Sequence, residues 1–172
     1  MDRNNVVLVD IFDNEKGIMS KTLAHKSPNL HRAFSVFLYH DNKMLIQKRA
    51  ASKYHSPNKW ANACCSHPRS KENIKESAIK RLKEELNVSC NIEELYSFIY
   101  MSKYNDDLFE YELDHVFIGE YNGEVKLDKN EASEYKWIDI KELSDDLVNN
   151  PNKYATWFII CAPIVIKELS NK

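Results

Sequence analysis

The sequence predicts an α+β fold, a mixed β-sheet flanked by helices in an α/β sandwich, and three observations lead to this prediction. Residues 31–40 and 44–49 are apolar, strand-like runs separated by Asp41-Asn42, as in a hairpin. Residues 72–88 place apolar side chains every four positions between charges, which is the spacing of an amphipathic helix. Strand-like runs outnumber helical ones, so we expect one sheet covered by a few long helices.

The expected elements follow one another along the whole chain. Short runs rich in β-branched and aromatic residues predict strands at residues 6–12, 31–40, 44–49, 60–63, 95–104, 109–121 and 134–138. Residues 13–17 are expected to form the turn after the first strand, since Gly17 can adopt positive φ. Helical patterns occupy residues 72–88, 140–148 and 154–169. Asn73, three residues before Glu76, is the expected cap of the first helix.

Length and composition indicate a single domain spanning residues 1–172. With 172 residues, of which 43% are hydrophobic and 29% charged, the chain can bury a core and is not disordered. A net charge of -2 argues against nucleic-acid binding. The presence of only 3 glycines argues against a glycine-rich phosphate loop.

No segment of the sequence predicts association with a membrane. The longest apolar run, residues 157–166, has ten residues and an internal proline, whereas a membrane span needs about 20. The start of the chain lacks the basic region of a signal peptide. The 4 cysteines form no CxxC pair and predict no disulfide framework. We therefore expect a cytoplasmic protein with reduced thiols.

The predicted helix at residues 72–88 carries the first motif. Glu85 lies four residues after Arg81, so the two side chains share one face and, read alone, form a solvated ion pair. In a longer frame the stretch resembles the Nudix box GX5EX7REUXEEXGU, a loop–helix–loop whose carboxylates hold a metal ion against a diphosphate. The matched positions are Ser66, Glu72, residues 80–85 and residues 87–88. Arg81 stands where the box has a glutamate, which argues against pyrophosphate hydrolysis within an expected Nudix-like fold.

Three further segments carry a more specific resemblance. They are AHKSPNLHRAFS at residues 24–35, WANACCSHP at residues 60–68 and FEYELDHVF at residues 109–117. Together and in this order they resemble the type 1 isopentenyl-diphosphate isomerases, a Nudix-fold family that interconverts isopentenyl diphosphate and dimethylallyl diphosphate. The resemblance covers almost the whole chain. It implies the same isomerisation in isoprenoid biosynthesis, by protonation and deprotonation through a carbocation-like intermediate.

The resemblance implies a catalytic set and a substrate-binding set. Cys65 and Glu112 match the residues that exchange protons with the substrate, and which of them protonates first is left open. Tyr100 matches a tyrosine that bonds near this glutamate, and Trp157 matches an aromatic face that shields the cation. The positions that match the family's diphosphate contacts are Lys21, Arg49, Lys53 and Arg81. Taken one at a time, the two aromatic residues would be interpreted as core and the four cations as solvated charges.

The resemblance also implies two divalent ions. The positions that match the first metal site are His25, His31, His67, Glu110 and Glu112. Three imidazoles and two carboxylates suit a five- or six-coordinate ion such as Mn, Mg, Fe or Zn. Glu110 and Glu112 are two residues apart on a predicted strand and share one face, although such a pair is more often solvated. Glu85 matches the carboxylate that holds a second ion, Mg, bound with the substrate diphosphate.

Three histidines lie outside the predicted metal site. His40, His55 and His115 match no motif and are expected to be surface or core histidines.

Two alternative functions remain open. A Nudix hydrolase acting on a nucleoside diphosphate is one alternative, and a non-catalytic module that binds a metal or a diphosphate is the other. The expected partner is a small diphosphate substrate. The sequence leaves open whether the protein is a monomer or a homodimer.

Overall fold

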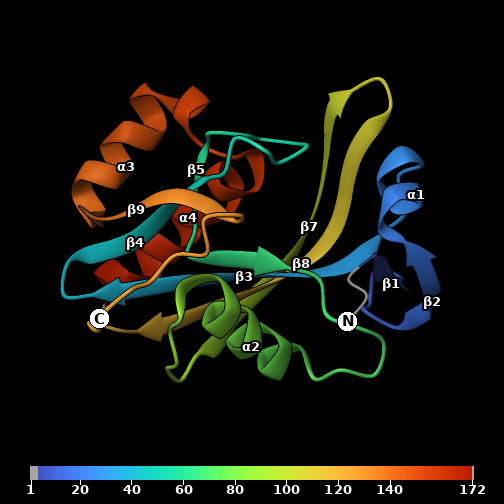
Figure 1. Cartoon of the computed structure of the whole chain (residues 1–172), viewed down its shortest axis with the longest axis horizontal. Coiled ribbons are helices and arrows are strands. Elements are labelled where there is room, and N and C mark those ends of the chain that lie inside the picture. Colours follow the sequence, from blue (N-terminus) through green and yellow to red (C-terminus); the bar gives the residue numbers. More distant parts are fainter. Residues whose placement is uncertain (1–3, 172) are drawn as a thin grey trace.

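The computed structural model describes residues 4–171, which form a curled mixed sheet with helices on both faces (Figure 1). The strands are β1 (Asn5–Val9), β2 (Glu15–Ser20), β3 (His31–His40), β4 (Lys43–Arg49), β5 (Trp60–Ala61), β6 (Cys64–Ser66), β7 (Glu93–Asn105), β8 (Leu108–Glu120) and β9 (Ala132–Asp139). The helices are α1 (Lys21–Lys26), α2 (Ile74–Leu86), α3 (Ile140–Asn149), the 3-10 turn η1 (Pro151–Lys153) and α4 (Thr156–Ser170). The predicted α+β sandwich is confirmed.

Strand β3 aligns the segments that carry the predicted site. It pairs antiparallel with β1, β4 and β6 and parallel with β8. In the parallel pair His31 lies opposite Glu112, and in the pair with β6, Ser35 lies opposite Cys65. Strand β7 pairs with β8 and places Tyr100 opposite Glu112. Because paired strands lie about 4.8 Å apart, this register brings distant parts of the sequence to one place.

Helix α2 covers one face of the sheet. Asn73 caps its first turn by accepting a hydrogen bond from the Glu76 amide at 3.1 Å, and Asn87 ends it in the left-handed conformation with a φ of 56°. Its apolar stripe packs on alternate residues of β3, and this core includes Phe34, Val36, Leu38, Leu82 and Leu86. The predicted helix and its cap are confirmed, and the two asparagines explain why it spans residues 74–86 rather than 72–88.

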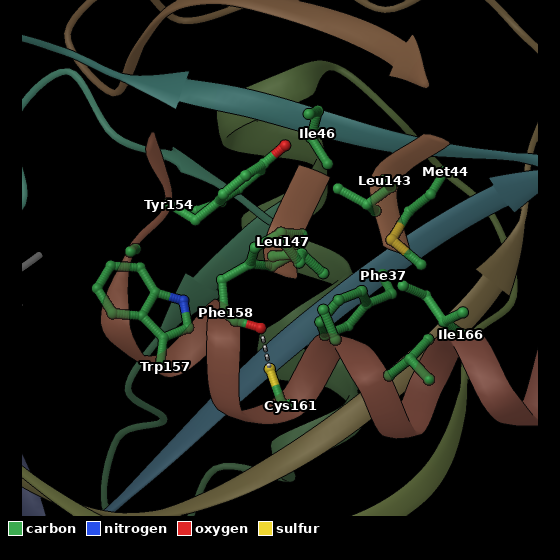
Figure 2. Packing of buried hydrophobic residues seen from close by; sticks show 14 of the residues in the cluster. Phe37, Met44, Ile46, Leu143, Leu147, Tyr154, Trp157, Phe158, Cys161 and Ile166 are labelled. Atoms are coloured by element: carbon green, nitrogen blue, oxygen red, sulfur yellow. Dashed lines mark hydrogen bonds between the residues drawn. The ribbon is translucent and has the colours of Figure 1, made fainter. Parts of the chain in front are cut away.

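Helices α3 and α4 cover the other face (Figure 2). Phe37 of β3 points into this core and stacks on Phe158 of α4, with ring centroids 5.8 Å apart. Leu143 and Leu147 of α3 pack in the same cluster. The apolar run around Pro163 therefore forms a largely buried helix, as predicted. Among residues 4–171, no helix has the length and apolar character needed to cross a bilayer.

The chain reversal after β1 lies earlier than predicted. Asp10 accepts hydrogen bonds from two backbone amides of the turn, and Asp13 has a φ of 65°. Gly17, expected in the turn, lies instead within β2 opposite Leu8, with a φ of 150°. Strand β2 and helix α1 were not predicted, because Glu15–Ser20 shows no apolar alternation and α1 has only 6 residues.

Candidate active site

One cavity of about 250 Å³ collects the predicted catalytic and substrate-binding residues. Its lining includes the four predicted catalytic residues Cys65, Tyr100, Glu112 and Trp157. It also includes the four predicted diphosphate contacts Lys21, Arg49, Lys53 and Arg81. The strand β6 and the E-x-E segment of β8 therefore face one space, whose volume lies near the lower end of ligand-pocket sizes.

Four of the predicted metal ligands gather in what we call the His/Glu cluster: His25 of α1, His31 of β3, His67 after β6 and Glu112 of β8. One possible ligand atom from each lies within 4.8 Å of all the others. The Nε2 atoms of His25 and His31 are buried and make no hydrogen bond, which is costly unless another group satisfies them. Imidazole nitrogens and a carboxylate oxygen in this arrangement fit a divalent metal ion.

Burial keeps two of these imidazoles neutral. Desolvation lowers the pKa of His25 to about 3 and the pKa of His67 to about 4. At His31 burial acts in the same direction, but the Glu112 carboxylate, 3.4 Å from its Nε2, outweighs burial and raises the pKa. A neutral imidazole has a free lone pair, which is the form that binds a metal.

Glu112 is held on both of its oxygens. Its Oε1 lies 2.9 Å from His67 Nε2, and its Oε2 accepts a hydrogen bond from the Tyr100 hydroxyl at 2.7 Å. Burial acts to raise the pKa of Glu112, but His31 and His67 outweigh it and hold the pKa well below its usual range. The carboxylate is therefore ionised and fixed in orientation at the cavity wall.

Glu110 has different neighbours from Glu112. Its Oε2 accepts a hydrogen bond from the Tyr104 hydroxyl at 2.6 Å and lies 3.1 Å from the Tyr100 hydroxyl, whose single proton it shares with Glu112. Its Oε1 lies 3.1 Å from His55 Nε2. Burial and the nearby Glu112 carboxylate raise its pKa. In the described part of the chain the His/Glu cluster does not include Glu110, so its role as a fifth ligand stays a prediction.

The adjacent cysteines of β6 have different surroundings. Cys64 is buried in the core shared with α2, whereas Cys65 lines the cavity, as the alternation of a strand requires. Burial raises the pKa of the Cys65 thiol far above its usual value against the opposing charge of Arg49, so the thiol keeps its proton at neutral pH. Asn62 donates a hydrogen bond to the Cys64 carbonyl at 2.6 Å and accepts one from Trp157 Nε1 at 3.0 Å.

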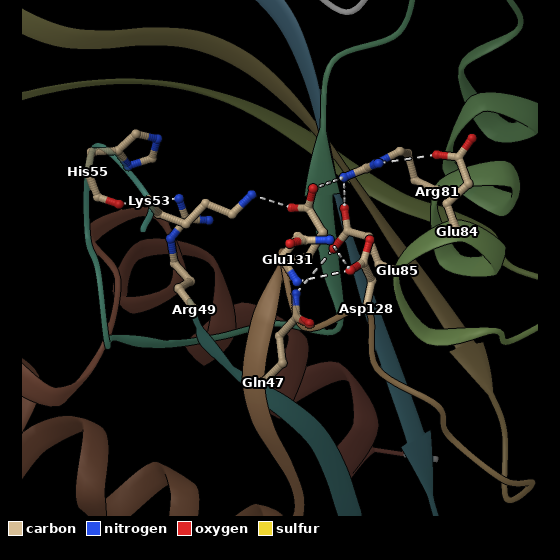
Figure 3. Close-up of polar contacts among 10 residues, drawn as sticks. Gln47, Arg49, Lys53, His55, Arg81, Glu84, Glu85, Asp128 and Glu131 are labelled. Carbon is tan, nitrogen blue, oxygen red and sulfur yellow. Dashed lines mark hydrogen bonds and ion pairs between the residues drawn. The ribbon is translucent and has the colours of Figure 1, made fainter. Parts of the chain in front are cut away.

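Two of the predicted diphosphate contacts are already paired with carboxylates (Figure 3). Lys53 Nζ donates to Glu131 Oε2 at 2.5 Å, and Arg81 lies 3.5 Å from Glu131 Oε1 and contacts Glu84 and Glu85. We call these five side chains the Lys53–Arg81 network. Glu85, the predicted Mg ligand, is only 3% exposed and does not line the cavity. Burial raises its pKa, and Arg81 opposes this shift.

The other two predicted diphosphate contacts lie over aromatic rings. The Arg49 guanidinium is 5.0 Å from the centre of the Trp157 ring and donates to the His55 carbonyl at 3.3 Å. Lys21 Nζ is 5.6 Å from the centre of the Tyr54 ring. Burial lowers the pKa of Lys21, and the nearby Glu112 opposes this shift. Contacts of this kind hold a cation at the cavity wall without neutralising it.

Several residues that the sequence interpretation did not assign to the site also line the cavity, and the polar ones among them include Tyr54, His55, Arg69 and Glu131. His55 is 8% exposed, as expected for a core histidine, but it also contacts Glu110. Two adjacent rings in an otherwise polar loop were the available signal for Tyr54 and His55. Glu131 lies in a turn rich in charged and amide residues and gave no such signal. His40 and His115 pair with nearby carboxylates and do not line the cavity.

Solved structures share this fold. The protein DR0079 from Deinococcus radiodurans superposes with a TM-score of 0.69 at 22% identity, over 85% of this chain and 90% of that one. The MutT protein from Methanosarcina mazei Go1 has a TM-score of 0.66 at 15% identity, over 83% of this chain and 96% of that one. At these identities the likeness shows the fold alone. A family model of the NUDIX domain matches residues 29–158, so fold and sequence together define a NUDIX-domain protein.

Sequence relatives narrow the class further. Isopentenyl-diphosphate Delta-isomerase 2 of Aromatoleum aromaticum is 42% identical over 164 residues, which cover 95% of this chain and 87% of that protein. Isopentenyl-diphosphate Delta-isomerase of Serratia proteamaculans is 41% identical over 155 residues, which cover 90% of this chain and 87% of that protein. The chain therefore belongs to the isopentenyl-diphosphate Delta-isomerase family, as the motifs predicted.

Proposed function

We propose that this enzyme interconverts isopentenyl diphosphate and dimethylallyl diphosphate in isoprenoid biosynthesis. The observation that carries the proposal is that Cys65 and Glu112 line one cavity whose wall also holds the cations Lys21, Arg49, Lys53 and Arg81. A substrate with an anionic diphosphate head and a small apolar tail matches this combination. Arginine and lysine bind phosphate oxygens, and the tail then lies between Cys65 and Glu112. Family membership supports the same reaction.

The reaction moves a double bond by one position and conserves every atom. A proton adds to the terminal CH2 carbon of the alkene, which becomes a methyl group, and positive charge develops on the tertiary carbon. A proton then leaves the CH2 group nearer the diphosphate, and its C–H electron pair forms the new double bond. We assign Cys65 and Glu112 as the donor and acceptor, with the order left open, and the two side chains recover their protonation states by exchange with solvent.

Neighbouring side chains support this acid–base pair. The hydrogen bond from Tyr100 to Glu112 fixes the carboxylate that faces the substrate. The Trp157 ring is 2% exposed and is held by its bond to Asn62, so it can present a water-free aromatic surface to the developing cation. The buried, protonated Cys65 thiol supports its role as an acid in one direction of the reaction.

Two divalent ions complete the proposal. The His/Glu cluster would hold one ion (Mn, Mg or Zn) through His25, His31, His67 and Glu112, with Glu110 beside it. When bound, such an ion supplies a fixed positive charge next to the Glu112 carboxylate. Glu85 is the proposed ligand of Mg that arrives with the diphosphate, since Mg prefers carboxylate and phosphate oxygens.

The test is incubation of the purified chain with isopentenyl diphosphate, Mn and Mg, followed by proton NMR. Signals of the dimethylallyl methyl groups are expected. A Nudix hydrolase would instead release phosphate from a nucleoside diphosphate, and a non-catalytic module would bind the diphosphate without changing it. Either of those results, without isomerisation, would overturn the proposal.

We further propose a cytoplasmic location, a single domain over residues 1–172 and a monomer or homodimer as the working form. The 4 cysteines are all free, which supports a reducing compartment. The two cores lie on opposite faces of one continuous sheet, which supports a single domain. Size-exclusion chromatography with light scattering would determine the number of subunits.

A further inference from the structure

One carboxylate joins two of the diphosphate-binding cations and has no role in the chemistry described so far. Glu131, just before β9, accepts a hydrogen bond from Lys53 Nζ at 2.5 Å through Oε2, and its Oε1 lies 3.5 Å from Arg81 Nη2 (Figure 3). Glu131, Lys53 and Arg81 all line the cavity. The substrate's head group and Glu131 therefore require the same two cations.

Glu131 has a fixed backbone and a side chain with access to the cavity. Its carbonyl accepts a hydrogen bond from the Ala50 amide at 3.0 Å, and its amide donates one to the Asp128 carbonyl at 3.0 Å. Its side chain is 27% exposed, whereas that of Glu85 is 3% exposed. The Glu131 carboxylate can therefore change partners without movement of the chain, whereas Glu85 is enclosed.

An incoming diphosphate meets this carboxylate as a like charge. Burial acts to raise the pKa of Glu131, but Lys53 and Arg81 outweigh it and lower the pKa, so the group is ionised. Two anions competing for the same cations in a partly buried site repel each other. A divalent cation that arrives with the diphosphate removes this conflict, because carboxylate oxygens are ligands that Mg prefers.

We propose that Glu131 makes diphosphate binding depend on a divalent cation. Its carboxylate holds Lys53 and Arg81 while no diphosphate is bound, and it turns to the cation, as a second ligand beside Glu85, when the diphosphate takes these two side chains. The inference rests on the proposed function, because it places a diphosphate in this cavity. It assigns a role to a residue outside all of the sequence motifs.

The test is calorimetric titration of the full chain with inorganic pyrophosphate, without Mg and with excess Mg. The protein is first loaded with Mn and desalted, so that the His/Glu cluster is in the same state in both titrations. Glu131→Gln keeps the side-chain shape and removes the charge. Without Mg, we expect this variant to bind pyrophosphate about tenfold more tightly, because the competing carboxylate charge is gone. The increase in pyrophosphate affinity that Mg causes should fall about tenfold or more, which is the size of one charged hydrogen bond.

Two variants serve as controls. Glu134→Gln removes a carboxylate three residues further along the chain. The Glu134 side chain is 53% exposed and pairs with Lys48 at 2.8 Å. This variant should leave the Mg enhancement of pyrophosphate binding unchanged. Glu131→Asp keeps the charge and should retain the enhancement to within about threefold, since its carboxylate can still bind the cation. We expect the same changes in pyrophosphate binding for Glu131→Ala, which replaces Glu131→Gln if thermal unfolding shows that the glutamine variant does not fold.

An equal Mg enhancement in wild type and in the variants that lack the charge would overturn the inference. Pyrophosphate binding that is weakened equally with and without Mg would also overturn the inference, because that pattern indicates a structural role only. Pyrophosphate has no carbon chain, so this result is separate from isomerisation. A chain that shows the Glu131 effect but leaves isopentenyl diphosphate unchanged would support this inference and refute the proposed function.

Discussion

The His/Glu cluster and the Lys53–Arg81 network contribute to one cavity but differ in how their charges are satisfied. In the cluster, two imidazoles are held neutral by burial, and two buried nitrogen atoms make no hydrogen bond. In the network, Lys53 and Arg81 each already contact a carboxylate. The cluster would therefore gain a missing partner on binding a cation, whereas the network would have to exchange partners on binding an anion.

The difference follows from the elements on which the two regions are built. His31 and Glu112 lie opposite each other on paired strands, so the sheet register fixes their separation. Lys53 and Glu131 lie outside regular elements, and Arg81 extends from helix α2. Long side chains from loops and helix surfaces change rotamer more easily than residues held in a sheet, which suits a region that exchanges partners.

The largest expected effect is on the cluster. His31→Gln removes one of the four proposed ligands, so the affinity of the protein for Mn should fall by at least about a hundredfold, as measured by equilibrium dialysis. His40→Gln is the matched control, because His40 pairs with Asp41 at 3.1 Å outside the cavity. Unchanged Mn affinity in the His31 variant would show that the cluster is not a metal site.

A smaller effect is expected from the network. Arg81→Met removes a charged hydrogen-bond donor from the cavity, so pyrophosphate binding measured by calorimetry should weaken about 10- to 100-fold. The free energy of unfolding should also fall by about 1–3 kcal/mol, because Glu85 stays buried without its cation.

Lys83→Met is the control for the Arg81 variant, since Lys83 is an exposed cation on the same helix. If both substitutions weakened pyrophosphate binding equally, general charge rather than the Arg81 contact would be responsible. The network would then lose its proposed role in binding the head group.

His55 tests where the cluster ends. The ring centroids of His55 and Tyr54 are 4.6 Å apart, and His55→Phe keeps a ring at this place. The substitution removes the contact between His55 and Glu110. If Glu110 supports the metal ion, Mn affinity should fall about tenfold, as for loss of an outer hydrogen bond to a ligand. With His40→Phe as the control, an unchanged affinity would place Glu110 and His55 outside the metal site and reduce the cluster to four ligands.

The smallest effect is expected away from both regions. The Tyr154 hydroxyl, 2.6 Å from the Asp146 carboxylate, and then Lys153 lower the pKa of Asp146 to about 2 from the usual 3.8. The lowered pKa means that the stabilisation is present above pH 3.8 and is lost as the pH falls through about 2. Asp146→Asn should therefore lower the free energy of unfolding by up to about 1 kcal/mol at neutral pH.

Denaturant unfolding at a series of pH values checks the Asp146 prediction. The difference from wild type should shrink as the pH falls from 3.8 towards about 2, and Mn and pyrophosphate binding should not change. A difference that stayed constant over this range would mean that the carboxylate charge does not stabilise the fold.

Local patterns predicted the parts of the fold and site that depend on neighbouring residues. The four-residue apolar spacing located α2, and the strand alternation placed Glu110 and Glu112 on one face. The family resemblance predicted that His31 and Glu112 share one metal site, but pairing between distant strands has no local signal, so the register that sets them opposite each other became visible only in the structure. Glu131 was missed for the same reason, because its importance comes from Lys53, which is remote in sequence.

Isomerisation in D2O tests most directly the central claim that Cys65 and Glu112 act on one substrate. Wild type should convert isopentenyl diphosphate into dimethylallyl diphosphate with deuterium in the new methyl group. Cys65→Ala and Glu112→Gln should each reduce the rate at least about a hundredfold, while thermal unfolding shows a folded protein and Cys65→Ala still binds Mn and pyrophosphate. A near-normal rate of deuterium incorporation by either variant would contradict the account.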